Sequence, residues 1–76
     1  MENLKEHIIK LVEIFAPQGD IVDENYDIQQ RIDSLSIVSF LLTVEDELMV
    51  EINMEDFDLS VLKTVSAFQE FIEQLL

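Results

Sequence analysis

The segment that decides the fold is RIDSLSIVSFLLTVEDEL, residues 31–48, the most apolar long stretch of a very acidic chain. Its apolar residues recur at steps of three and four, which is typical of one face of an α-helix. The main row is Ile37, Leu41, Val44 and Leu48, widened by Val38 and Leu42. Leu35 and Phe40 fall outside this row, so the helix expected over 34–48 is apolar around much of its circumference.

Two more amphipathic helices are predicted, one on each side of this segment. The first covers residues 3–15, with Asn3 as its cap, and Pro17 and Gly19 end it. The last begins after Thr64, whose hydroxyl is a suitable cap. Its apolar row is Val65, Phe68, Phe71, Ile72 and Leu75.

The two connections have less regular patterns. From 18 to 33, acidic residues alternate without period with Ile21, Val22, Tyr26 and Ile28, so we expect a long loop pinned to the core by these apolar members. Residues 53–62 predict at most one helical turn. The expected fold is all-α: a four-helix bundle of three long helices and one short one, in a single domain over residues 1–76.

Composition excludes several classes of protein. The 76 residues include 17 acidic and 4 basic ones, a net charge of -13, which disfavours binding to nucleic acid or to anionic membranes. There is no cysteine, and hence neither a disulfide framework nor a thiolate metal site. The sequence has no long apolar run and no secretory pattern, so we expect a cytoplasmic, monomeric protein without membrane insertion.

No constellation of catalytic residues is evident. Asp23, Asn25 and Asp27 have the spacing of a calcium loop, but Ile28 stands where such a loop needs glycine and Ser34 where it needs glutamate. His7 is the only histidine, and we expect it at the surface. The sequence therefore predicts neither a metal site nor an enzyme.

The Asp33–Ser34 step that opens the central helix has two interpretations. As local structure, it is N-cap chemistry, in which a side-chain oxygen accepts a free N–H of the first turn. As a site, it places a hydroxyl at the positive end of a long helix, where a phosphate on Ser34 is stabilised. Asp33 could then hold Mg²⁺ during phosphate transfer.

The whole chain resembles the acyl carrier and peptidyl carrier protein family. The resemblance lies in its length, acidity and helix order, in DSLSIVSFLLTVEDEL (residues 33–48), and in KTVSAFQEFI (residues 63–72). It implies that Ser34 carries 4'-phosphopantetheine, attached by a phosphopantetheinyl transferase. The thiol of this arm would hold acyl or aminoacyl groups as thioesters, so no cysteine is needed. The carrier itself would not be an enzyme.

The resemblance also implies a docking surface for loading ligases and acceptor enzymes with basic patches. Apolar residues extend from Ser34, and acidic residues follow at the far end of the helix, where they would favour association rate and specificity. The expected partner-binding residues are Leu35, Val38, Leu42, Glu45, Asp46, Glu47, Glu51 and Ile52.

Departures from the family bear on the pathway. Ser36 and Ser39 replace acids common in fatty-acid carriers, and no glycine precedes Asp33. INMEDFDLSVLKT (residues 52–64) is similar to the D-alanyl carrier proteins of teichoic acid modification, although Leu62 stands where those often have tryptophan. We therefore expect a specialised carrier loaded by an adenylating ligase. The alternatives are a general fatty-acid or polyketide carrier and, last, an unmodified acidic interaction domain.

Overall fold

The computed structural model describes residues 3–53, 55 and 57–76, and in this part of the chain the regular elements are all helical. The three long helices are α1 (Leu4–Phe15), α3 (Ser34–Leu48) and α4 (Val65–Leu75). The short ones are α2 (Ile28–Arg31) and the 3₁₀ helix η1 (Leu59–Leu62). The fold is thus the predicted helical bundle of carrier-protein type. Met54 and Asp56, within the segment 53–62 that was predicted as one turn, lie outside the described residues.

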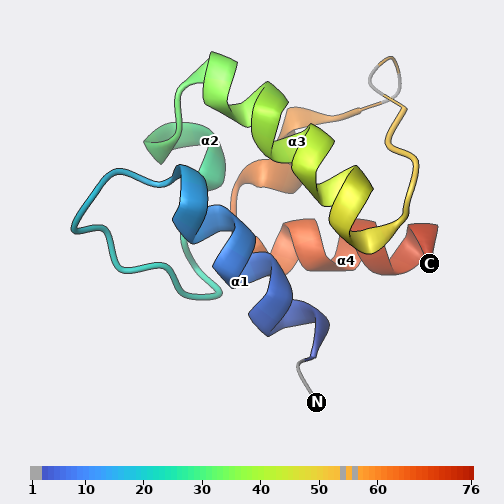
Figure 1. The fold of residues 1–76 in the computed structure, drawn as a ribbon, viewed down its shortest axis with the longest axis horizontal. Coiled ribbons are helices and arrows are strands. Elements are labelled where there is room, and N and C mark those ends of the chain that lie inside the picture. Colours follow the sequence, from blue (N-terminus) through green and yellow to red (C-terminus); the bar gives the residue numbers. More distant parts are fainter. Residues whose placement is uncertain (1–2, 54, 56) are drawn as a thin grey trace.

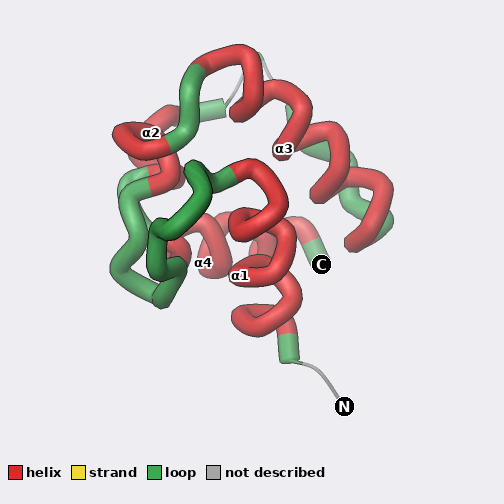
Figure 2. Tube along the Cα trace, turned by 60° about the vertical axis from the view of Figure 1, so that its left-hand side comes forward, coloured by secondary structure: helices red, strands yellow, loops and turns green. Residues whose placement is uncertain are grey.

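The helices pack around α1, which contacts both α3 and α4 (Figure 1). Helix α2 lies beside the N-terminal end of α3 and also contacts η1, which packs against α4 (Figure 2). The start of α3 therefore lies against α2, which in turn contacts η1. Among the described residues, no helix is long and apolar enough to span a membrane.

Side-chain caps fix where the helices begin. The expected caps are confirmed: Asn3 Oδ1 accepts the Glu6 N–H at 2.8 Å, and Thr64 Oγ1 accepts the Ala67 N–H at 3.0 Å. An aspartate plays the same part before each of the other helical segments. These caps are Asp27, Asp33 and Asp58. Several acids of the chain thus satisfy free N–H groups at helix N-termini, where their negative charge also suits the helix dipole.

The region 18–33 contains a helix that the sequence pattern does not reveal. Helix α2 lies within the predicted loop, and its four residues are too few to display a period of 3.6. Tyr26 and Ile28 pin this connection to the core as expected, and Val22 is partly buried. Ile21 is 86% exposed, so its expected contribution to the core was wrong.

Polar contacts also hold the long connection in place. The Arg31 guanidinium donates to Asp20 through Nη2 at 2.7 Å and Nε at 3.0 Å, and the Tyr26 hydroxyl donates to the same carboxylate at 2.6 Å. Burial and the Asp20 carboxylate raise the pKa of Tyr26 to about 12, so the phenol remains a donor. The Lys5 ammonium pairs with Glu24 at 2.8 Å. These contacts tie the connection to α1 and α2.

The buried face of α3 differs from the predicted row by one important residue. Phe40 is fully buried and packs against Phe15 and Phe68, with ring centroids 5.9 and 5.3 Å apart. The core face is Ile37, Phe40, Leu41 and Val44, with Leu48 partly buried at its edge. Val38 and Leu42, expected to widen that face, are instead more than half exposed. The outer side of α3 consequently carries exposed apolar residues.

Candidate functional site

Ser34 is the first residue of α3, and its side chain is not used to cap the helix. Asp33 is the cap, and its Oδ1 accepts the Ser36 N–H at 2.7 Å. This hydrogen bond, with one from the Ser36 side chain, lowers the pKa of Asp33 below its ordinary value. Because Asp33 caps the helix, the Ser34 hydroxyl is left exposed at the positive end of a 15-residue helix.

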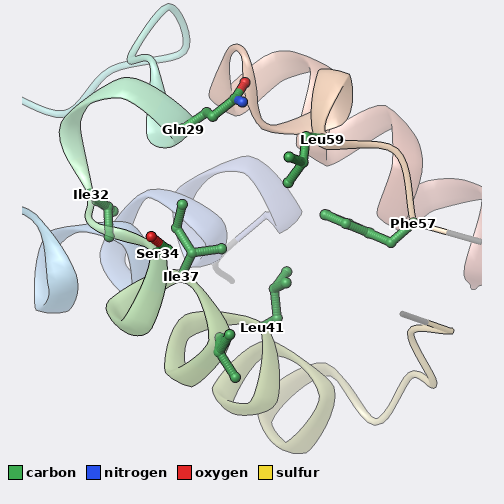
Figure 3. Close-up of a pocket in the computed structure, with 8 residues that line it drawn as sticks. Gln29, Ile32, Ser34, Ile37, Leu41, Phe57 and Leu59 are labelled. Atoms are coloured by element: carbon green, nitrogen blue, oxygen red, sulfur yellow. The ribbon is translucent and has the colours of Figure 1, made fainter. Parts of the chain in front are cut away.

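Ser34 opens onto an apolar groove of about 420 Å³ (Figure 3). One wall is the inner side of α3, where Ile37 and Leu41 lie, and the opposite wall is formed by Phe57 and Leu59. The remaining lining residues are Gln29, Ile32 and Val38. Ser34 is the one serine in this lining. A chain attached to its oxygen could therefore lie along a surface that is largely apolar.

Gln29, Phe57 and Leu59 are site residues that the sequence did not indicate. They come from α2, from the segment before η1, and from η1 itself. None of these segments has a period that places it against α3. For Phe57 and Leu59, a signal is present, because they are apolar residues in an otherwise acidic segment. That signal does not specify which helix the two side chains face.

The outer side of α3 carries most of the predicted docking residues. Leu35 is 85% exposed, and Val38 and Leu42 are also more than half exposed. They follow one another at steps of three and four and form one apolar row beginning beside Ser34. Asp46, Glu47 and Glu51 are exposed near the far end of the helix. The structure thus brings an apolar row and an acidic end together on one helix.

Glu45 and Ile52 were also predicted for the docking surface, but both are at least partly buried. Ile52 is a core residue with 5% exposure, so its assignment to an accessible surface is corrected. The Glu45 carboxylate is partly buried, and its Oε2 accepts the Ile52 N–H at 2.8 Å. This contact holds the segment that follows α3 against the helix. The hydrogen bond spans seven residues and depends on the sharp turn after Leu48, which the helical period does not predict.

Two of the acids considered for metal binding, Asp23 and Asp27, accept hydrogen bonds from backbone N–H groups. Asp23 Oδ1 accepts the Asn25 N–H at 2.9 Å, and Asp27 caps α2. Within the described residues, no group of three acidic or histidine side chains is arranged for a metal ion. His7 lies at the rim of the bundle, partly exposed, with its Nε2 3.9 Å from a Glu47 carboxylate oxygen.

Comparisons of the sequence with known proteins show its family. The model of the phosphopantetheine attachment site matches residues 2–72. The D-alanyl carrier protein of Bacillus mycoides (strain KBAB4) is 34% identical over 62 residues, covering 76% of this chain and 77% of that protein. The D-alanyl carrier proteins of Bacillus cereus (strain B4264) and Bacillus anthracis (strain CDC 684 / NRRL 3495) match with the same identity and coverage. No solved structure shows significant similarity.

Proposed function

Because the chain belongs to the phosphopantetheine-attachment family of carrier proteins, we propose that Ser34 is the residue to which 4'-phosphopantetheine is attached. The observation that carries this proposal is the exposed Ser34 hydroxyl, released from capping by Asp33 and lying at the mouth of an apolar groove. Ser36 is less suitable, because its N–H is bound to Asp33 and its side chain interacts with the same carboxylate.

The residues around Ser34 fit such a group. The first turn of α3 provides a positive helix end for the phosphate, and the exposed Asp33 carboxylate is a candidate ligand for Mg²⁺ while a transferase attaches the arm. Ile37, Leu41, Phe57 and Leu59 supply apolar surface next to the attachment point. When bound, the group supplies a thiol that forms thioesters. The chain contributes position and recognition, and carriers of this family are not enzymes.

Carrier proteins of this family interact with a phosphopantetheinyl transferase and with partner enzymes. We propose that those partners dock on the outer side of α3. Leu35, Val38 and Leu42 would give apolar contact, and Asp46, Glu47 and Glu51 would attract Arg and Lys side chains. Exposed ion pairs of this kind contribute mainly to association rate, which suits a protein that must leave one enzyme for the next.

We propose an aminoacyl cargo, loaded by an adenylating ligase, with D-alanine as the leading example. The names of the relatives support this cargo, since they are D-alanyl carrier proteins. The charge of the chain supports it as well, because an aminoacyl thioester carries an ammonium group and the carrier has a net charge of -13. Teichoic acid modification is the pathway in which such a cargo would be used.

The groove favours a second candidate, a general acyl carrier of fatty-acid or polyketide synthesis. Its lining is mainly apolar, and its volume of about 420 Å³ can accept part of an acyl chain.

We further propose that residues 1–76 act as one carrier domain, as a monomer. A cytoplasmic location would suit this role, because coenzyme A, the donor of the arm, is a cytoplasmic metabolite.

A competition assay separates the two cargoes. The protein carrying the arm is incubated with a D-alanine-adenylating ligase, D-alanine and ATP, or with acyl-CoA donors and an acyltransferase, and thioesters are measured by intact-protein mass spectrometry. We expect D-alanylation to be faster, and absent from Ser34→Ala. Faster loading from acyl-CoA donors would favour the general acyl carrier and contradict the aminoacyl proposal.

A further inference from the structure

Met49 combines two unfavourable features at the end of α3. Its backbone is left-handed, with φ 54° and ψ 46°, and it is the only residue other than glycine in the described part of the chain with a positive φ. Its side chain is also 90% exposed, which leaves a large apolar group in water. Glycine or asparagine is the usual residue at such a helix C-cap, since a side chain with a Cβ is strained there.

The fold gains nothing visible from the Met49 side chain. The capping role belongs to the backbone, because the Met49 N–H donates to the Glu45 carbonyl, and any residue except proline supplies that donor. The exposed side chain buries little apolar surface. A strained and exposed position that does not serve the fold is a reason to look for a function.

The position of Met49 suggests what that function is. Leu35, Val38 and Leu42 form the exposed apolar row of α3, and Met49 follows Leu42 after seven residues, two helical turns further on. With Met49 the apolar positions extend from Leu35, beside Ser34, to the opposite end of the helix, a distance of roughly 21 Å. They reach the acidic end of α3, where Asp46 is also exposed.

We propose that Met49 is a specificity-determining contact for a loading enzyme, and that it enters an apolar socket bordered by basic side chains. This inference rests on the proposed function, and the charge around Met49 identifies the kind of partner. Asp46, Glu47 and Glu51 surround it in sequence and are exposed, so the partner surface around the socket must be cationic. The flexible, polarisable thioether of methionine adapts well to such a socket.

The test compares Met49→Gly, which removes the side chain and suits the backbone, with Met49→Leu, which keeps an apolar side chain of similar volume. Ile21→Ala is the matched control, because Ile21 is an equally exposed apolar residue away from α3. The probe is whichever enzyme loads the wild-type protein fastest in the competition assay. Its kcat/KM is measured for each variant carrying the arm, together with the melting temperature and the mass in solution.

We expect Met49→Gly to melt no lower than the wild type and to lose about tenfold in kcat/KM. Met49→Leu and Ile21→Ala should stay within about twofold of wild type. Equal kcat/KM for Met49→Gly and Met49→Leu would overturn the inference while leaving Ser34 as the attachment site. A lower melting temperature for Met49→Gly, or a wild-type dimer that this variant dissociates, would also overturn it. Failure of every enzyme to load the wild type would contradict the proposed function itself.

Discussion

Replacing Glu45 tests the finding that this acid supports the fold. Its Oε2 accepts the Ile52 N–H at 2.8 Å in a partly buried contact, and the Ile52 side chain is only 5% exposed. Glu45→Ala would leave that N–H without its partner in a place where water has limited access. Loss of such an acceptor costs about 1–3 kcal/mol, so the variant should be destabilised by that amount. For a domain of this size, the melting temperature falls by roughly 4–8 °C for each kcal/mol.

Circular dichroism melts and urea titrations of four proteins measure the effect. Glu45→Gln keeps a side-chain oxygen that can accept the Ile52 N–H, so it should lose less than about 1 kcal/mol. Asp46→Ala is the control, because Asp46 is a neighbouring exposed acid, and it should stay within about 0.5 kcal/mol of wild type. A Glu45→Ala protein that is as stable as Asp46→Ala would refute this reasoning and return Glu45 to the docking surface.

Three further predictions concern charge. Asp46→Lys combined with Glu51→Lys should slow loading by a basic partner enzyme at low salt with little change in melting temperature; an unchanged rate would mean that these exposed acids only solubilise the protein. The pKa of Asp20 lies below its ordinary value of 3.8, chiefly because of the Arg31 hydrogen bonds and then because of the Tyr26 hydroxyl. The Asp20 carboxylate therefore contributes its full stabilisation at pH values above 3.8, and this contribution is lost as the pH falls through the lowered pKa. Asp20→Asn should therefore destabilise the protein most above about pH 5 and least in strong acid, and urea titrations showing a loss independent of pH would contradict this. Finally, the net charge of -13 predicts a melting temperature that rises between low and physiological ionic strength, and a melting temperature indifferent to salt would contradict that repulsion.

The long helices were predictable because their evidence is local. The apolar rows of α1 and α4 repeat at helical spacing over three turns, and Asn3 and Thr64 are residues that prefer the capping position. Helix α2 was missed for the same reason, since four residues between Asp27 and Ile32 contain no repeat. Local patterns locate long elements and leave short ones unassigned.

The orientation of α3 was harder to predict. A helix that is apolar around much of its circumference permits more than one buried face, and its contacts with the other helices select among them. Phe40 turns inward because Phe15 and Phe68 lie there, which leaves Val38 and Leu42 outside. The apolar period alone thus did not determine which residues face outward, whereas the family resemblance did indicate Leu35, Val38 and Leu42, which are exposed.

The candidate site likewise combines residues that the sequence predicts with residues that only the fold brings to it. Ser34 and Asp33 were predicted as the site from the DSL step together with the length, acidity and helix order that resemble the carrier family, although the sequence did not decide which of the two caps α3. The opposite wall of the groove, formed by Phe57 and Leu59, depends on how a distant segment folds back. The role of Glu45 depends on the turn at Met49, whose left-handed backbone has no signature in its residue type.

The central claim is that Ser34 accepts the phosphopantetheine arm, and intact-protein mass spectrometry tests it most directly. Wild type, Ser34→Ala and Ser36→Ala are incubated with coenzyme A, Mg²⁺ and a promiscuous phosphopantetheinyl transferase. We expect the wild type and Ser36→Ala each to gain the mass of one arm, and Ser34→Ala to gain none. An arm gained by Ser34→Ala, or a wild type that gains none, would contradict the account.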